Sequence, residues 1–154
     1  MRRKVAATEY NMISLILTGH GRIASGIHEA IVQVFGPQNA LHVVDFPEGV
    51  TTAELERELS EALEQCDGDV VFFTDLLGGS PFRLASTLAT ERSGTEVIAG
   101  MNLAMFAEML FERDSVADAA EFRARAAEAG RAGVTSLAER MARSRQRAEA
   151  TDGL

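Results

Sequence analysis

Short apolar runs alternate four times with segments of helical periodicity, and this alternation limits the possible folds more than any other feature. In chain order the apolar runs are 13–18, 41–46, 70–74 and 96–99. They are rich in leucine and β-branched residues and lack polar alternation, which is typical of strands buried on both faces. Strands that alternate with helices predict an α/β domain, with a mostly parallel four-stranded sheet covered by helices on both faces.

Two helix starts are also predicted from local signals. Ser80 followed by Pro81 is typical of a serine N-cap with proline at the first helical position. A later helix over 115–129 is predicted to begin at Ser115, because Asp118 three residues on completes a capping pair, and to stop at Gly130.

A histidine between two glycines, His20, follows the first apolar run directly. Right-handed crossovers place the carboxyl ends of parallel strands at one edge of the sheet, so His20, Asp45, Asp75 and Asn102 should all lie along that edge. With the strand order 2-1-3-4, the switch point falls between the first and third strands, and His20 and Asp75 flank it. Asp75 could then accept the proton on one ring nitrogen and leave the other nitrogen as a nucleophile.

The loop over 78–82 could bind an anion beside this pair. Gly78 and Gly79 allow a close approach of the backbone, and a helix that starts at Ser80 points free N–H groups at the same edge. The candidate phosphate-binding residues are therefore Gly78, Gly79, Ser80 and Phe82, with the Ser80 hydroxyl as a helper. Each signal also has a structural explanation: helix capping for Ser80, a turn residue for Asp75, and a hydrogen-bonded loop histidine for His20.

Composition excludes several classes of function. The formal net charge of −8 argues against nucleic-acid binding, which favours a basic surface. Cys66 is the single cysteine, so the sequence predicts no intrachain disulfide and no cysteine-based metal site, in keeping with a cytoplasmic protein. No window approaches the ~18 apolar residues of a membrane span. Residues 1–11 lack the apolar segment of a secretory signal and are expected to be a disordered extension.

Three motifs, in the same order, resemble a known family. The segment 18–21, Thr-Gly-His-Gly after an apolar strand, is similar to the phosphorylation site of the mannose-family enzyme IIA components of the bacterial phosphoenolpyruvate-dependent sugar phosphotransferase system. Asp75 with 78–82, Gly-Gly-Ser-Pro-Phe, resembles the second motif of that family, and 97–102 resembles the third. The resemblance covers about 12–137, which is most of the chain.

Two segments point to one branch of this family. The stretch 74–83, together with 45–48, is more similar to the N-acetylgalactosamine/galactosamine branch than to the mannose branch. The resemblance therefore implies an amino sugar or a mannose-type sugar as the transported compound.

The resemblance implies a phosphoryl relay through a phosphohistidine, with no metal or nucleotide cofactor. The histidine-containing phosphocarrier protein would phosphorylate His20, which would pass the group to a separate IIB component that works with IIC and IID membrane components. The resemblance implies a phosphotransferase in which Asp75 would orient the imidazole and the Ser80 loop would hold the phosphoryl group. Family members are homodimers that exchange a carboxyl-terminal strand, for which 133–137 is the candidate fifth, antiparallel strand.

The expected organisation is a IIA domain over 12–137 and a charged helical or frayed tail over 138–154, which is too short for a IIB domain. Two other functions stay open. One is a IIA-like subunit that donates phosphoryl groups to dihydroxyacetone kinase, and the other is a regulatory module that binds a phosphorylated ligand without chemistry. Two further histidines compete with His20: His28 on the flank of the first helix and His42 early in the second strand.

Overall fold

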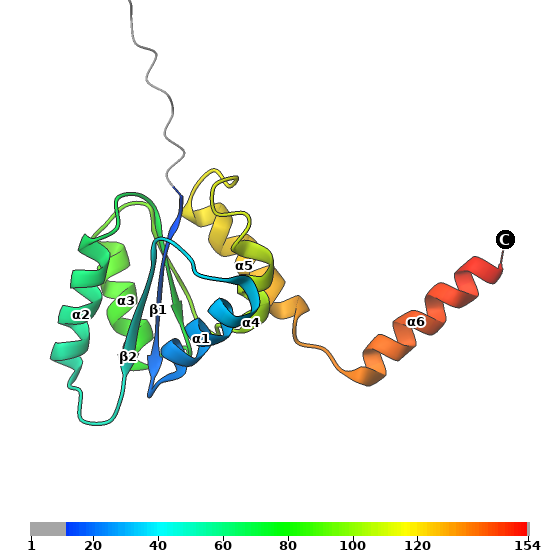
Figure 1. Ribbon diagram of the computed structural model, residues 1–154, viewed down its shortest axis with the longest axis horizontal. Coiled ribbons are helices and arrows are strands. Elements are labelled where there is room, and N and C mark those ends of the chain that lie inside the picture. The colour runs from blue at the N-terminus through cyan, green and yellow to red at the C-terminus, as the bar shows by residue number, and fades with distance from the viewer. Residues whose placement is uncertain (1–11, 154) are drawn as a thin grey trace, which may run out of the picture.

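The computed structural model describes residues 12–153, which form an α/β domain followed by a separate helix (Figure 1). The strands are β1 (Ser14–His20), β2 (Leu41–Phe46), β3 (Val70–Thr74) and β4 (Thr95–Ile98). The helices are α1 (Ile23–Phe35), α2 (Thr52–Glu64), α3 (Ser80–Thr90), α4 (Leu103–Met109), α5 (Ala119–Ala132) and α6 (Leu137–Asp152). The strands pair in parallel in the order β2-β1-β3-β4, which confirms the predicted fold class and strand order.

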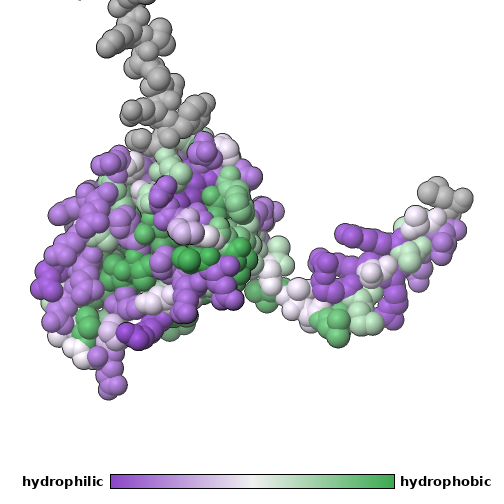
Figure 2. Space-filling view, in the orientation of Figure 1, coloured by the Kyte–Doolittle hydropathy of each residue, from purple (hydrophilic) through white to green (hydrophobic). Residues whose placement is uncertain are grey.

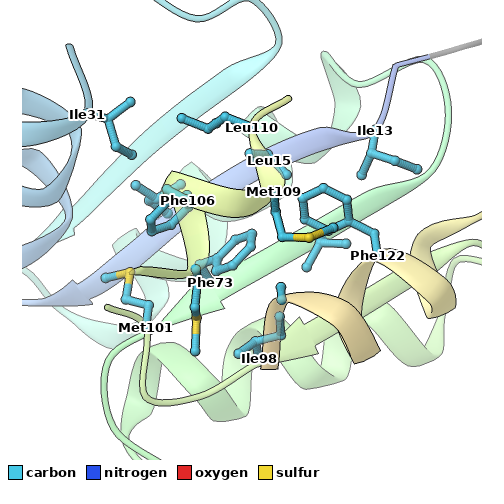
Figure 3. Packing of buried hydrophobic residues seen from close by; sticks show 14 of the residues in the cluster. Ile13, Leu15, Ile31, Phe73, Ile98, Met101, Phe106, Met109, Leu110 and Phe122 are labelled. Atoms are coloured by element: carbon cyan, nitrogen blue, oxygen red, sulfur yellow. The ribbon is translucent and has the colours of Figure 1, made fainter. Parts of the chain in front are cut away.

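The sheet separates two apolar cores. Helices α1, α4 and α5 cover one face and α2 and α3 the other (Figure 1). On the first face the ring of Phe73 lies 4.6 Å from that of Phe106 and 6.3 Å from that of Phe122, measured between centroids (Figure 3). Its neighbour Phe72 belongs to the core on the opposite face, because successive strand residues point to opposite sides. The need to supply both cores explains why the apolar runs lack polar alternation.

β1 is longer at its carboxyl end than the predicted 13–18. It continues to His20 because Gly19 and His20 still pair in register with Asp45 and Phe46 of β2. The histidine is therefore the last residue of a strand rather than the first residue of a loop, so sheet pairing fixes its backbone.

The start of α3 corrects the prediction for Ser80. Gly79 is the N-cap residue, with φ −69° and ψ 165°, while Ser80 and Pro81 are the first two helical residues. The Gly79 carbonyl accepts the N–H of Arg83 at 3.0 Å, so the helical ladder begins one residue earlier than predicted. The Ser80 hydroxyl does not cap the helix and instead accepts a hydrogen bond from Arg83 Nη2 at 3.4 Å.

The bounds of α5 were also predicted wrongly. Asp118, not Ser115, is the N-cap, and its carboxylate accepts the N–H of Glu121 at 2.8 Å. The helix continues through Gly130 because this glycine serves packing rather than termination. A Cβ there would lie 2.5 Å from Met105 Cε, so Gly130 allows α5 to approach α4 closely.

A buried arginine joins the edge of the sheet at which the strands begin to the segment before α5. Arg113 is 3% exposed, and its guanidinium donates to the carbonyl oxygens of Ile13, Asn39 and Ala40 at 2.9, 2.7 and 2.7 Å. Burial lowers the pKa of Arg113 to about 10, which still leaves the group charged at neutral pH. Arg113 thus holds together the amino ends of β1 and β2.

The carboxyl-terminal part of the described chain leaves the domain. Helix α6 has no buried residue and stands away from the sheet (Figure 1). Val134 and Leu137 are each 76% exposed, and apolar surface gathers where α6 begins (Figure 2). Residues 133–136 form no strand within the single chain, so the exchanged strand stays a prediction. The expected extension over 1–11 lies outside the described residues. No helix in 12–153 is long and apolar enough to cross a membrane.

Candidate functional site

His20 and Asp75 meet at the carboxyl edge of the sheet, between β1 and β3. The Nδ1 atom of His20 lies 2.9 Å from Asp75 Oδ2, which also accepts the backbone N–H of His20 at 2.9 Å. The backbone N–H of Leu76 donates to the other carboxylate oxygen, Oδ1, at 2.8 Å. Because a carboxylate only accepts hydrogen bonds, the neutral imidazole carries its proton on Nδ1 and keeps the lone pair on Nε2. The His20 side chain is 46% exposed, so this nucleophilic nitrogen is open to a partner.

The charge of Asp75 supports this arrangement. Its side chain is 12% exposed, and burial alone would raise its pKa. Hydrogen bonds from the backbone and ring of His20 and from the Leu76 N–H outweigh burial, so the pKa of Asp75 is lowered from its usual value. The group is therefore a carboxylate at neutral pH and holds the ring in one tautomer.

Two glycines beside His20 make the close pairing possible. A Cβ on Gly19 would lie 2.9 Å from Asp75 Cγ, so any side chain there would push the carboxylate away from the ring. Gly21 has φ +58°, a conformation that favours glycine. It exchanges two backbone hydrogen bonds with Phe46, at 2.8 and 3.2 Å, so the residue after His20 is as well fixed as the strand before it.

The segment Leu76–Gly79 forms a tight turn against the imidazole. The Gly79 N–H donates to the Leu76 carbonyl at 3.1 Å, and Gly78 has φ +80° at the third position, as a type II turn requires. A Cβ on Gly79 would lie 2.7 Å from His20 Cε1 and 3.5 Å from Nε2. The turn therefore places its backbone directly beside the free ring nitrogen.

The start of α3 provides anion donors next to this turn. The N–H groups of Ser80 and Phe82 lie in the first helical turn, where no preceding helical carbonyl can accept them. They lie at the positive end of the helix dipole, which favours a negatively charged group. Pro81 has no N–H, and the N–H of Gly79 is already bonded to Leu76. Ser80 and Phe82 are thus better placed as backbone donors than Gly79, whose part is to allow the close approach.

A comparison with known families identifies this fold and motif set. The family model EIIA-man, described as the PTS system fructose IIA component, matches residues 14–127. The chain belongs to this family. This IIA component is a phosphotransferase that carries a phosphoryl group on histidine in a sugar phosphotransferase system, and IIA components pass that group to IIB components.

Individual relatives agree with the family assignment. The IIA component is 32% identical over 108 residues to the PTS system fructose-specific EIIA component of Bacillus subtilis, covering 69% of this chain and 74% of the relative. It is 33% identical over 127 residues to the PTS system mannose-specific EIIAB component of Escherichia coli, covering 81% of this chain and 39% of that longer protein. The crystal structure of phosphotransferase system component EIIA from Streptococcus agalactiae superposes with a TM-score of 0.78 at 24% identity, covering 83% of this chain and 99% of that one.

Asp45 and Asn102 lie in the IIA component where the strand pattern predicts them, but their side chains form hydrogen bonds with residues other than His20. The Asp45 carboxylate accepts the Ser25 N–H at 2.9 Å and also the Ser25 hydroxyl, which ties α1 to β2. The Asn102 side chain caps α4 by accepting the N–H of Met105 at 3.3 Å. Asn102 also donates to the Gly130 carbonyl of α5 at 3.1 Å, so it links α4 to α5.

One neighbour of the histidine is missing from the set of residues predicted from sequence. The ring of Phe46 lies 5.9 Å from that of His20, between centroids, and the two rings are tilted by 54°. The only sequence signal for it is its position as the last residue of the apolar run at 41–46. The competing histidines lie elsewhere: His28 is within α1, and His42 pairs with Ile16 near the middle of β1. Within residues 12–153 no group of three metal-binding side chains comes together.

Adding a single methyl group at Gly79 is expected to slow phosphorylation of His20 by about 10- to 100-fold, because the new Cβ would displace the imidazole. The φ of −69° at Gly79 suits alanine, but alanine is a poorer N-cap residue than glycine and its Cβ would lie 3.3 Å from the Leu76 carbonyl oxygen, so the thermal midpoint of Gly79→Ala should fall by only a few degrees. Single-turnover phosphorylation kinetics and thermal unfolding measure the two effects. The matched control is Gly26→Ala, since a Cβ there meets no atom within 4 Å. A Gly79→Ala protein phosphorylated at the wild-type rate would show that the imidazole does not need this contact.

Proposed function

We propose that His20 is the residue phosphorylated in this IIA component, by the histidine-containing phosphocarrier protein, and that it passes the group to a separate IIB component. The observation that carries the proposal is the hydrogen bond between Nδ1 and Asp75, which leaves Nε2 as the free nucleophile of an exposed histidine. The glycine turn and the first turn of α3 supply the rest of the site.

In the transfer step, the Nε2 lone pair attacks the phosphorus atom of the donor phosphohistidine. The P–N bond of the donor breaks, and its electron pair stays on the donor nitrogen. A His20 ring that is phosphorylated on Nε2 and still protonated on Nδ1 carries a positive charge, which the Asp75 carboxylate stabilises at 2.9 Å. The backbone N–H groups of Ser80 and Phe82 bind the outer phosphoryl oxygens, where negative charge accumulates during transfer.

The proposed substrate of the complete system is an amino sugar or a mannose-type sugar. Its support is the similarity of 74–83 and 45–48 to the N-acetylgalactosamine/galactosamine branch, and the mannose-specific name of the Escherichia coli relative. The IIC and IID membrane components would take up the sugar, and this IIA component would act in the cytoplasm. The proposed IIA domain spans 12–137, and the proposed tail spans 138–154.

Purified IIA component with phosphoenolpyruvate, enzyme I and phosphocarrier tests the proposal directly. The phosphorylated peptide should contain His20, and the label should then move to an added IIB component. If the label moved only to dihydroxyacetone kinase subunits, the protein would be a phosphoryl donor for that kinase and not a component of a sugar transport system. No label on any histidine would leave the non-catalytic binding module as the function.

We also propose a homodimer held in part by 133–137. Strand β4 is an edge of the sheet, and an exchanged segment could satisfy its unpaired backbone groups. The 76% exposure of Val134 and Leu137 in the single chain supports a second copy as their partner. Light scattering at micromolar concentration should give the mass of a dimer, and deletion from Gly133 onward should give a monomer. A full-length monomer, or a truncated protein that is still a dimer, would contradict this prediction.

A further inference from the structure

A hollow of about 430 Å³ opens between the carboxyl ends of α2 and α3, which lie side by side on one face of the sheet (Figure 1). It is lined by the buried Leu63 and Cys66 and the half-buried Leu88, with the exposed Glu64 and Glu91 at its two walls. Both helices end where the strands begin, so the hollow lies at the edge of the sheet opposite the proposed phosphorylation site. The phosphoryl relay therefore does not account for it.

The free charges at this hollow are negative. The arginine in its lining, Arg92, is already engaged, because its guanidinium donates to the carbonyl oxygens of Leu63, Cys66 and Gly68 at 3.4, 2.8 and 3.1 Å. Glu64 and Glu91 form no ion pair with any residue in 12–153. A partner that fits this surface therefore combines an apolar centre with positive charges on both sides.

Helix α6 has this combination. Leu137 and Met141 lie one turn apart on the same face and are 76% and 51% exposed, and Figure 2 shows the apolar surface where the helix begins. Arg140 and Arg145 border this face, roughly 60° to one side and 80° to the other side of Leu137 at 100° per residue. No ion pair in the described part of the chain uses either arginine. The family model ends at residue 127, so its match does not include α6.

The direction of the chain brings α6 of one subunit to the hollow of another. Strand β4 runs from Thr95, at the edge where the strands begin, to Ile98. A segment 133–137 that pairs antiparallel with β4 of a second copy runs the opposite way and ends near Thr95 of that copy. The hollow adjoins this point, because Leu88 and Glu91 come just before β4 in the chain. Helix α6 then begins beside the hollow, with no linker to span.

We propose that the hollow between α2 and α3 is the docking site for the first turns of α6 from the partner subunit, a claim that rests on the proposed homodimer. Leu137 and Met141 enter the hollow and cover its apolar lining. Arg140 and Arg145 lie toward the walls that carry Glu64 and Glu91. The second copy thus buries a helix face that the single chain leaves in water.

The single cysteine reports on this docking, since Cys66 lines the hollow and is 6% exposed. Alkylation of Cys66 by iodoacetamide should be at least about tenfold faster in Met141→Glu than in the wild type, because a carboxylate cannot enter an apolar hollow and α6 undocks. The matched control is Gln146→Glu, which adds the same charge on the face opposite Leu137 and should react at the wild-type rate. Burial raises the pKa of the Cys66 thiol, so all rates are compared at one pH. Both variants should keep the dimer mass and accept a phosphoryl group as fully as the wild type.

Dilution tests which subunit supplies the helix. When the wild-type dimer dissociates, its alkylation rate should rise to that of Met141→Glu. A rate that stays constant on dissociation would mean that α6 does not dock on the partner, and would overturn the proposal. Equal rates for dimeric wild type and Met141→Glu would also overturn the docking while leaving the dimer intact. A wild-type protein that is monomeric at every concentration would overturn the homodimer itself, which separates that failure from failure of the docking alone.

Discussion

Replacement of His20 by alanine is expected to abolish phosphorylation completely. The reaction forms a covalent bond to the imidazole, and no other described side chain combines exposure, an Asp75-type partner and adjacent anion donors. The fold should survive, because His20→Ala keeps the backbone N–H bond to Asp75 and loses one side-chain hydrogen bond, worth about 1 kcal/mol, and the ring contact with Phe46 at the exposed edge of the sheet. Intact-mass spectrometry after incubation with phosphoenolpyruvate, enzyme I and phosphocarrier measures the added phosphoryl group.

The two remaining histidines are the matched controls for this result. His28→Ala and His42→Ala should both accept a phosphoryl group as fully as the wild type, because neither lies at the carboxyl edge of β1. If His20→Ala were fully phosphorylated, His28 or His42 would be the phosphorylated residue, and the proposed mechanism would be wrong.

The second large effect is expected for Asp75→Asn, which should slow phosphoryl transfer by roughly 10- to 1000-fold. Asparagine keeps the shape of the side chain but can turn its NH₂ group toward Nδ1. The imidazole then favours a proton on Nε2, and the nucleophilic lone pair is lost from that atom. Single-turnover kinetics with phosphorylated phosphocarrier measures the loss. Transfer at the wild-type rate would show that the carboxylate does not orient the ring.

The same substitution has a defined dependence on pH. The pKa of Asp75 is lowered in the folded protein, so its hydrogen bonds favour folding at pH values above the ordinary aspartate pKa of about 4. That contribution is lost as the pH falls from about 4 through the lower pKa of the folded state. The difference in unfolding free energy between wild type and Asp75→Asn should therefore shrink below about pH 4.

Much of the site could be predicted from sequence because few topologies suit the pattern. Four apolar runs separated by helices allow parallel pairing with right-handed crossovers, which bring all strand ends to one edge. The strand order then places His20 beside Asp75, and the structure shows them in contact at 2.9 Å. No side-chain detail was needed for this step, since the alternation brings the strand ends to one edge and the strand order makes His20 and Asp75 neighbours.

The features that could not be predicted depend on contacts between residues that only the folded chain brings together. Ser80 has the sequence signature of an N-cap, yet Gly79 takes that place because the turn from Leu76 positions its carbonyl for Arg83. Gly130 has the signature of a helix stop, yet it lies against Met105 of a helix distant in sequence. In both cases a glycine is required by a contact that local propensity does not encode.

Arg113 has a consequence for how this protein can adapt to a new growth temperature. Its guanidinium donates to the Ile13 carbonyl, next to the amino end of β1. His20 ends the same seven-residue strand, roughly 20 Å away at about 3.3 Å per residue. Substitutions that far apart, with no shared partner, usually have additive effects. Mutations around Arg113 can therefore change the lifetime of the folded chain and leave the speed of the relay unaltered, so selection can act on heat tolerance and sugar flux separately.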